Sequence, residues 1–199
     1  LELNITVPDG FAVAATGDST GTRMNGDSTV TYNYSSRSYG PFYNTGSFSV
    51  ARYKQYKRTI GTVGVTVYSL PRVYGSDNAK RIDKIFGMVG VILDYYRELN
   101  GGVAYPWKEL RIVESGRSLF PLGVADLEWT IYPQDIFNYY PDSLNNSQIH
   151  LLAHEIAHQW WGVKVTPNAS QSAWLAEGMA EHSARSMVDS YLGISGKDS

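Results

Sequence analysis

The segment His154-Glu155-Ile156-Ala157-His158 places two imidazoles four residues apart, with a carboxylate directly after the first. In a helix this spacing brings both histidines to one face, one turn apart, where they can hold a single metal ion. Glu155 lies to the side of that face and can take a proton from water on the ion. A catalytic zinc site needs a third protein ligand and an open fourth position. The motif therefore predicts two of the three ligands of a hydrolytic zinc site.

Glu177 is the natural candidate for the third ligand. It follows His158 after eighteen intervening residues, within the stretch Trp-Leu-Ala-Glu-Gly at 174–178. The sequence predicts one helix over about 147–161 and another from about 172 towards 191. If the second helix returns antiparallel to the first, it delivers the Glu177 carboxylate to the ion.

Two further side chains lie one helical turn from predicted ligands. Glu181 is four residues after Glu177, where it can accept a hydrogen bond from a ligand imidazole and fix its tautomer. A solvated helix carboxylate is the alternative role for Glu181. His150 precedes His154 by one turn, and one straight helix does not easily bring three successive turns to one ion. We therefore expect His150 to be a structural residue or a partner of a ligand.

The elements that position these residues change in character near residue 70. Residues 1–70 contain alternating, β-prone stretches and no helical periodicity, so we expect an all-β segment. Beyond it, apolar residues from Ile82 to Tyr96 recur at helical spacing, with Ser76 or Asp77 as the cap. Short strands are expected over 110–113 and 124–131. The predicted fold class is α+β, an all-β segment followed by a mixed α/β domain.

Composition excludes several classes of function. The 199 residues include no cysteine, which rules out a disulfide framework, a cysteine zinc site and a thiol nucleophile. Seventeen basic and nineteen acidic side chains give a formal charge of −2, whereas nucleic-acid binding needs a basic surface, so no nucleic-acid partner is expected. No apolar run reaches membrane-spanning length, so membrane association is expected only through segments outside this chain. A sequence without cysteine and rich in Ser, Thr, Asn and Tyr favours an extracytoplasmic or membrane-attached location.

The zinc motif and its surroundings resemble those of a known family. Residues 154–162 read HEIAHQWWG, and Glu177 lies within WLAEGMA at 174–180. This pattern resembles the gluzincin zinc aminopeptidases, typified by membrane alanyl aminopeptidase, in which HExxH is followed after eighteen residues by Glu in Trp-Leu-x-Glu-Gly. By this resemblance, residues 1–70 are the C-terminal part of an N-terminal β-sheet domain. Residues 71–199 are then a truncated thermolysin-like catalytic domain without the family's C-terminal helical domain.

The resemblance implies a role for each site residue. His154, His158 and Glu177 would bind one Zn2+ ion, and Glu155 would be the general base for zinc-activated water. The family also has a Gly-x-Met-Glu-Asn strand whose Glu binds the α-amine of the peptide substrate. Here Glu128 is the best match to that Glu, although the preceding glycine is displaced.

The function implied is zinc-dependent peptide hydrolysis that releases N-terminal residues. The altered amine-anchor strand leaves two alternatives open: a thermolysin-like endopeptidase, and a catalytically inactive relative that binds peptides or serves as a scaffold. The family's oxyanion-stabilising tyrosine lies well beyond the third ligand. Because losing one oxyanion donor costs about 10²–10³-fold in rate, we expect these 199 residues alone to be weakly active or inactive.

Overall fold

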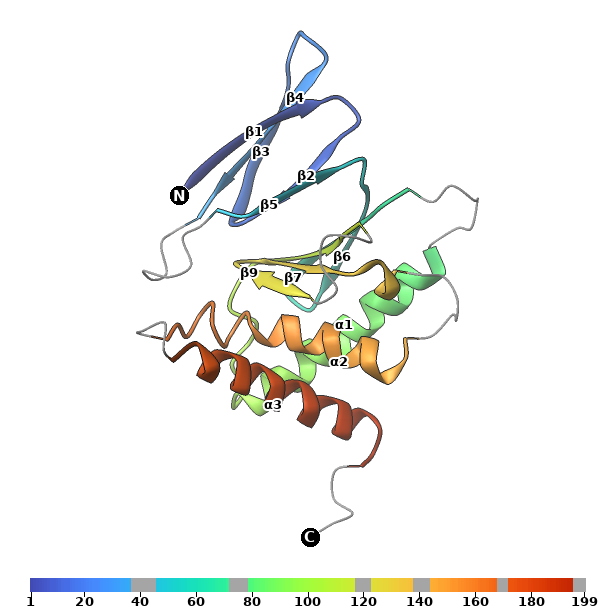
Figure 1. The fold of residues 1–199 in the computed structure, drawn as a ribbon, viewed down its shortest axis with the longest axis vertical. Helices are drawn as coiled ribbons and strands as arrows, with labels where there is room; N and C mark the ends of the chain where they lie inside the picture. Colours follow the sequence, from blue (N-terminus) through green and yellow to red (C-terminus); the bar gives the residue numbers. More distant parts are fainter. Residues whose placement is uncertain (37–45, 72–78, 117–122, 138–143, 168–171, 195–199) are drawn as a thin grey trace.

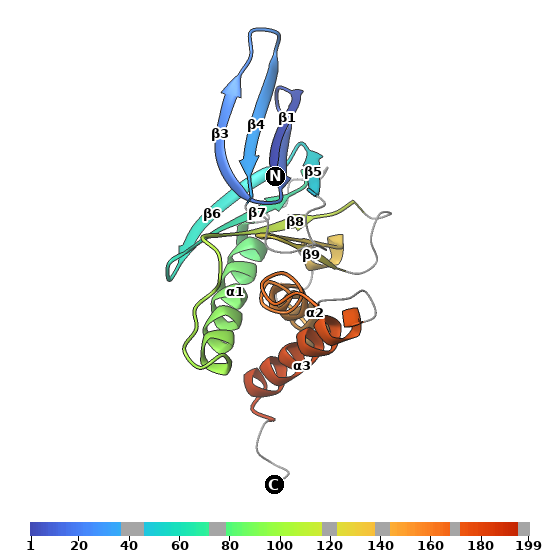
Figure 2. The same ribbon diagram turned by 90° about the vertical axis from the view of Figure 1, so that its left-hand side faces the viewer.

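The computed structural model describes residues 1–36, 46–71, 79–116, 123–137, 144–167 and 172–194. Figures 1 and 2 show three layers, with an N-terminal β layer, a mixed sheet in the middle and helices on the far side of that sheet. This element order agrees with the predicted α+β arrangement. The proposed helix caps Ser76 and Asp77 lie outside the described residues.

The N-terminal layer consists of two small antiparallel sheets. Strand β4 (Thr29–Ser35) lies between β1 (Glu2–Pro8) and β3 (Asp18–Met24) in a three-stranded sheet. Strands β2 (Ala12–Ala15) and β5 (Phe48–Ala51) form a two-stranded sheet. All four residues of β2 are buried, because this strand lies between the rest of the layer and the middle sheet.

The middle sheet has five strands in the order β6-β7-β8-β10-β9. Its strands are β6 (Lys54–Ile60), β7 (Val63–Ser69), β8 (Glu109–Glu114), β9 (Val124–Asp126) and β10 (Trp129–Tyr132). Strand β8 is parallel to both β7 and β10, whereas β6 and β9 are antiparallel edge strands.

This topology differs from the boundary expected at residue 70. Strands β6 and β7 precede residue 70, yet β7 pairs with β8 in the sheet that carries the site. The change of sheet falls between β5 and β6, because β5 pairs with β2 in the N-terminal layer. We propose that the boundary between the two parts of the chain lies between these two strands.

The predicted strand over 124–131 is a hairpin instead. Strands β9 and β10 pair antiparallel on either side of a two-residue turn, Leu127-Glu128. The Asp126 carboxylate accepts a hydrogen bond from the Leu127 amide, which stabilises the turn. Glu128 has a φ of 65°, a left-handed conformation that is uncommon outside glycine. Nothing in the local alternation of side chains indicates this turn.

Three helices lie on one side of the middle sheet, and the third packs mainly against the first two. They are α1 (Ala79–Leu99), α2 (Asn146–Ala157) and α3 (Ala173–Tyr191). None of the helices in the described ranges is both long enough and apolar enough to span a bilayer. Helix α2 begins at a capping box in which the Asn145 side chain accepts from the Gln148 amide. It ends at Ala157, earlier than the expected 161, and the chain then turns through Gly162 with a φ of 113°.

Successive side chains along the strands of the middle sheet point to opposite faces, so one hydrophobic core forms on the helix side and another on the side of the N-terminal layer. On β8, Leu110 and Ile112 face the helices, while Arg111 and Val113 face the N-terminal layer. Arg111 is only 2% exposed, and its guanidinium donates to the carbonyls of Ala15 and Gly17. A buried guanidinium needs such acceptors, so these bonds fix the N-terminal layer on the sheet.

Candidate metal centre

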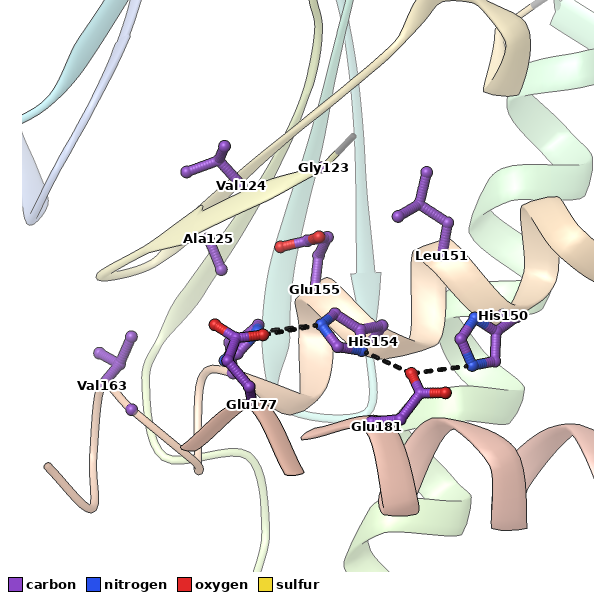
Figure 3. A pocket seen from close by; sticks show the side chains of 12 residues that line it. Gly123, Val124, Ala125, His150, Leu151, His154, Glu155, Val163, Glu177 and Glu181 are labelled. Carbon is purple, nitrogen blue, oxygen red and sulfur yellow. Dashed lines mark hydrogen bonds and ion pairs between the residues drawn. The ribbon is translucent and has the colours of Figure 1, made fainter. Parts of the chain in front are cut away.

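Helices α2 and α3 bring three potential metal ligands together (Figure 3). The Nε2 atoms of His154 and His158 are 3.1 Å apart, and Glu177 Oε2 lies 3.5 Å and 3.4 Å from them. Tetrahedral zinc with bonds of about 2.0–2.2 Å separates its ligand atoms by about 3.3 Å. The donor types and their spacing therefore fit one zinc ion.

The other nitrogen of each ligand imidazole has an acceptor of its own. His154 Nδ1 lies 3.2 Å from Glu181 Oε2, and His158 Nδ1 lies 2.9 Å from the Trp161 carbonyl oxygen. When each Nδ1 carries the proton, each Nε2 presents its lone pair to the ion. Burial lowers the pKa of His154, and the nearby His158 acts in the same direction, which favours the neutral form that binds metal.

Glu181 also contacts His150, whose Nε2 is 3.2 Å from the same Oε2 atom. The hydrogen bond to Arg185 is the main cause that lowers the pKa of Glu181, and it keeps the carboxylate ionised. The structure thus places both Glu181 and His150 beside the ligand candidate His154, in the positions considered from the sequence.

Replacing Glu181 with glutamine is expected to weaken zinc affinity by about 10–100-fold, because the amide loses the charge that orients the His154 proton. Competition with a chromogenic chelator measures this. Glu98→Gln, an exposed carboxylate on α1, is the matched control. Equal affinity for the two variants would assign Glu181 to the solvated surface.

Glu155 lies between α2 and β9, and only 4% of its surface is exposed. Burial raises the pKa of its carboxyl to about 8, and the Glu177 carboxylate acts in the same direction. A bound cation acts in the opposite direction. A group that titrates near neutrality can both accept and return a proton.

Gly123, which directly precedes β9, approaches Glu155 very closely. A Cβ atom on Gly123 would lie 2.4 Å from Cγ and Oε1 of Glu155. Gly123 and Ala125 lie with Glu155 along a cavity of about 520 Å³ that also contains the three ligand candidates. Strand β9 is an edge of the middle sheet among the described strands, and its residues Val124 and Ala125 line this cavity.

The structure does not bring Glu128 into this cavity. Glu128 lies in the turn after β9 and lines a separate cavity of about 460 Å³ beside Asp18. Its carboxylate is 3.7 Å from the Arg111 guanidinium, on the side of the N-terminal layer. The sequence predicts one continuous strand over 124–131, whereas the structure has a turn at Leu127-Glu128 that displaces this side chain. The predicted amine anchor is therefore not supported by this geometry.

Glu128 affects stability through its protonation. Burial raises the pKa of its carboxyl to about 7 from an ordinary value of 4.5, against the opposite effect of Arg111. The folded chain holds this proton more tightly than the unfolded chain. The free energy of unfolding therefore falls as the pH rises from about 4.5 to about 7 and is constant, for this group, outside that window.

Glu128→Gln removes this titration, so the variant should lose less stability between pH 5 and pH 8 than the original protein. The expected difference is about 1–3 kcal/mol. Urea unfolding of both proteins at the two pH values measures it. If the free energy of unfolding changed equally with pH in both proteins, the raised pKa of Glu128 would be contradicted.

Two residues at the site, Gly123 and Gln159, have no functional role predicted from the sequence. Both contact residues that are distant in sequence: Gly123 lies against Glu155, and Gln159 bonds the β9–β10 turn. A local pattern carries no signal for such contacts.

Comparisons with known proteins are consistent with the geometry. The model of the peptidase family M1 domain matches residues 91–197, more than half of the chain and including all three ligand candidates. Among solved structures, the chain is similar to a mutant of the M1 zinc metallopeptidase from Deinococcus radiodurans. The two share 21% sequence identity with a TM-score of 0.65 over 96% of this chain and 41% of that one. This similarity confirms the predicted fold class. No curated protein sequence matches the chain significantly.

Proposed function

The chain belongs to peptidase family M1, and from that premise we propose that it performs zinc-dependent hydrolysis of peptide bonds. The observation that carries the proposal is the His154–His158–Glu177 donor set beside the buried Glu155. His154, His158 and Glu177 would hold the zinc ion. When bound, zinc polarises the scissile carbonyl and lowers the pKa of water.

The role proposed for Glu155 follows from its position. Its carboxylate accepts a proton from the attacking water and delivers it to the nitrogen of the departing amine. Because Glu155 is buried between α2 and β9, bulk water competes little for this proton. The outer backbone of β9 can pair with an extended peptide, as edge strands commonly do, which would bring the scissile bond to the metal centre.

For specificity we propose release of N-terminal residues, by analogy with the aminopeptidases that the zinc motif resembles. A specific observation favours a second candidate, an endopeptidase. The residues in and directly before β9 that line the cavity are Gly123, Val124 and Ala125, none of which carries a carboxylate for the α-amine. The Asp126 side chain points away and accepts from Thr16.

A panel of peptides with free and acetylated N-termini tests both candidates. The full-length protein should be assayed, because this chain spans only 41% of the solved M1 structure. Cleavage of free-amine peptides alone supports the aminopeptidase, and internal cleavage of acetylated peptides supports the endopeptidase. Activity should disappear with a chelator and return with zinc. A zinc-loaded protein that cleaves neither set would contradict the peptidase proposal and favour an inactive peptide-binding relative.

A further inference from the structure

Gln159 directly follows the second histidine of the zinc motif and is completely buried. Its Nε2 donates to the Asp126 carbonyl at 2.8 Å, and its Oε1 accepts from the Glu128 amide at 3.0 Å. Asp126 and Glu128 flank Leu127 at the β9–β10 turn. One side chain next to a metal ligand therefore satisfies both a backbone acceptor and a backbone donor of the hairpin that borders the cavity.

A second contact holds the same strand from the opposite side. The Thr16 hydroxyl donates to Asp126 Oδ2 at 2.9 Å, and both side chains are buried. Thr16 follows β2 in the N-terminal layer, and it is fixed there by a hydrogen bond from the Ser47 amide to its hydroxyl oxygen. The Asp126 side chain thus connects the cavity-lining strand to the N-terminal layer.

Strand β9 needs such contacts because its own pairing is short. It is an edge strand of three residues that pairs only with β10 among the described strands. At the same time its position must be accurate, because Gly123 leaves no room for one additional carbon beside Glu155. Small shifts of reacting groups have large effects on rate.

We propose that Gln159 and the Thr16–Asp126 pair are positioning residues that fix strand β9 relative to Glu155 and the metal ligands. Through Gln159, the strand that contacts the peptide is held by the same segment that carries His158. Through Thr16, the N-terminal layer contributes to the geometry of the cavity without lining it. The expected effect on peptide binding rests on the proposed function.

Two hydroxamate inhibitors distinguish binding to strand β9 from binding to the metal ion, and both are measured on the zinc-loaded, full-length protein. Acetohydroxamic acid contacts the ion alone, whereas a peptidyl hydroxamate also needs the strand. In Gln159→Met the peptidyl compound should bind about tenfold more weakly. This is the effect expected when the hydrogen bonds from Gln159 that position strand β9 are lost. Acetohydroxamic acid and zinc affinity should be unchanged.

Gln148→Met is the matched control, because Gln148 lies at the other end of α2 and bonds Asn145 and Asp135 rather than β9. It should leave the binding of both compounds unchanged. Unchanged binding of both compounds to Gln159→Met would overturn the proposal. An equal loss of affinity for both hydroxamates, together with weaker zinc binding, would also overturn it, because Gln159 would then support only the metal site.

The Thr16 contact supplies a second, milder test. Thr16→Val removes the hydroxyl with little change of shape, and Thr16→Ser retains it. Peptidyl hydroxamate binding should weaken in the valine variant and recover in the serine variant. Equal binding by the two variants would overturn the role assigned to the Thr16–Asp126 pair.

Hydrogen exchange tests the contacts independently of catalysis. The Glu128 amide should exchange at least about tenfold faster in Gln159→Met, while amides paired between β1 and β4 should not change. If the original protein cleaves no peptide, the proposed function fails, but this comparison still decides whether Gln159 holds the turn. Unchanged exchange at Glu128 would show that it does not.

Discussion

Replacing Glu155 with glutamine is expected to lower peptide turnover by about 10²–10⁴-fold while zinc remains bound. The amide has nearly the same shape as the carboxyl group but cannot accept the proton of the attacking water. Glu155 is not among the three clustered ligand candidates, so the donor set for zinc is unchanged. The cavity beside Gly123 should also keep its shape, because no atom is added.

Steady-state kinetics on a free-amine peptide, together with zinc content by mass spectrometry, tests this expectation. Glu98→Gln provides the control for an exposed carboxylate far from the motif in sequence. A Glu155→Gln variant with full activity and full zinc content would show that another group acts as the base. A variant that lost zinc would instead show that Glu155 supports the metal site.

The metal centre could be predicted because its information is mostly local. His154 lies on α2, and His158 directly follows that helix with helical backbone angles, so the helix repeat alone places them together. Glu177 needed one further assumption, an antiparallel return of the next helix. Helices α2 and α3 pack side by side and run in opposite directions (Figure 1), which fulfils it.

The parts that could not be predicted depend on contacts between distant segments. Strand β7 resembles its β neighbours in sequence, but its pairing with β8, across α1, assigns it to the middle sheet. The β9–β10 turn contains Leu127 and Glu128 and none of the residues that usually mark a hairpin, so the sequence predicts a continuous strand there. That single error also misplaced Glu128, because a turn residue does not follow the alternation of a strand.

The close approach of Gly123 to Glu155 leads to the second large expected effect. Gly123→Ala should lower peptide turnover by about 10²-fold or more, because a Cβ at 2.4 Å from the Glu155 carboxyl group forces the strand or the carboxyl to move. The φ of Gly123 lies outside the left-handed region, so alanine is compatible with its backbone and only the lack of space opposes it.

Activity and zinc affinity measured together separate this displacement from loss of the metal site. None of the three ligand candidates is on β9: His154 lies on α2, His158 directly follows it and Glu177 lies on α3, so zinc affinity should change by no more than a few-fold. Gly116→Ala is the control, because an added Cβ there meets no atom within 4 Å. If Gly123→Ala retained full turnover, the strand could yield without consequence, and the positioning of β9 by Gln159 and Thr16 would lose its significance for catalysis.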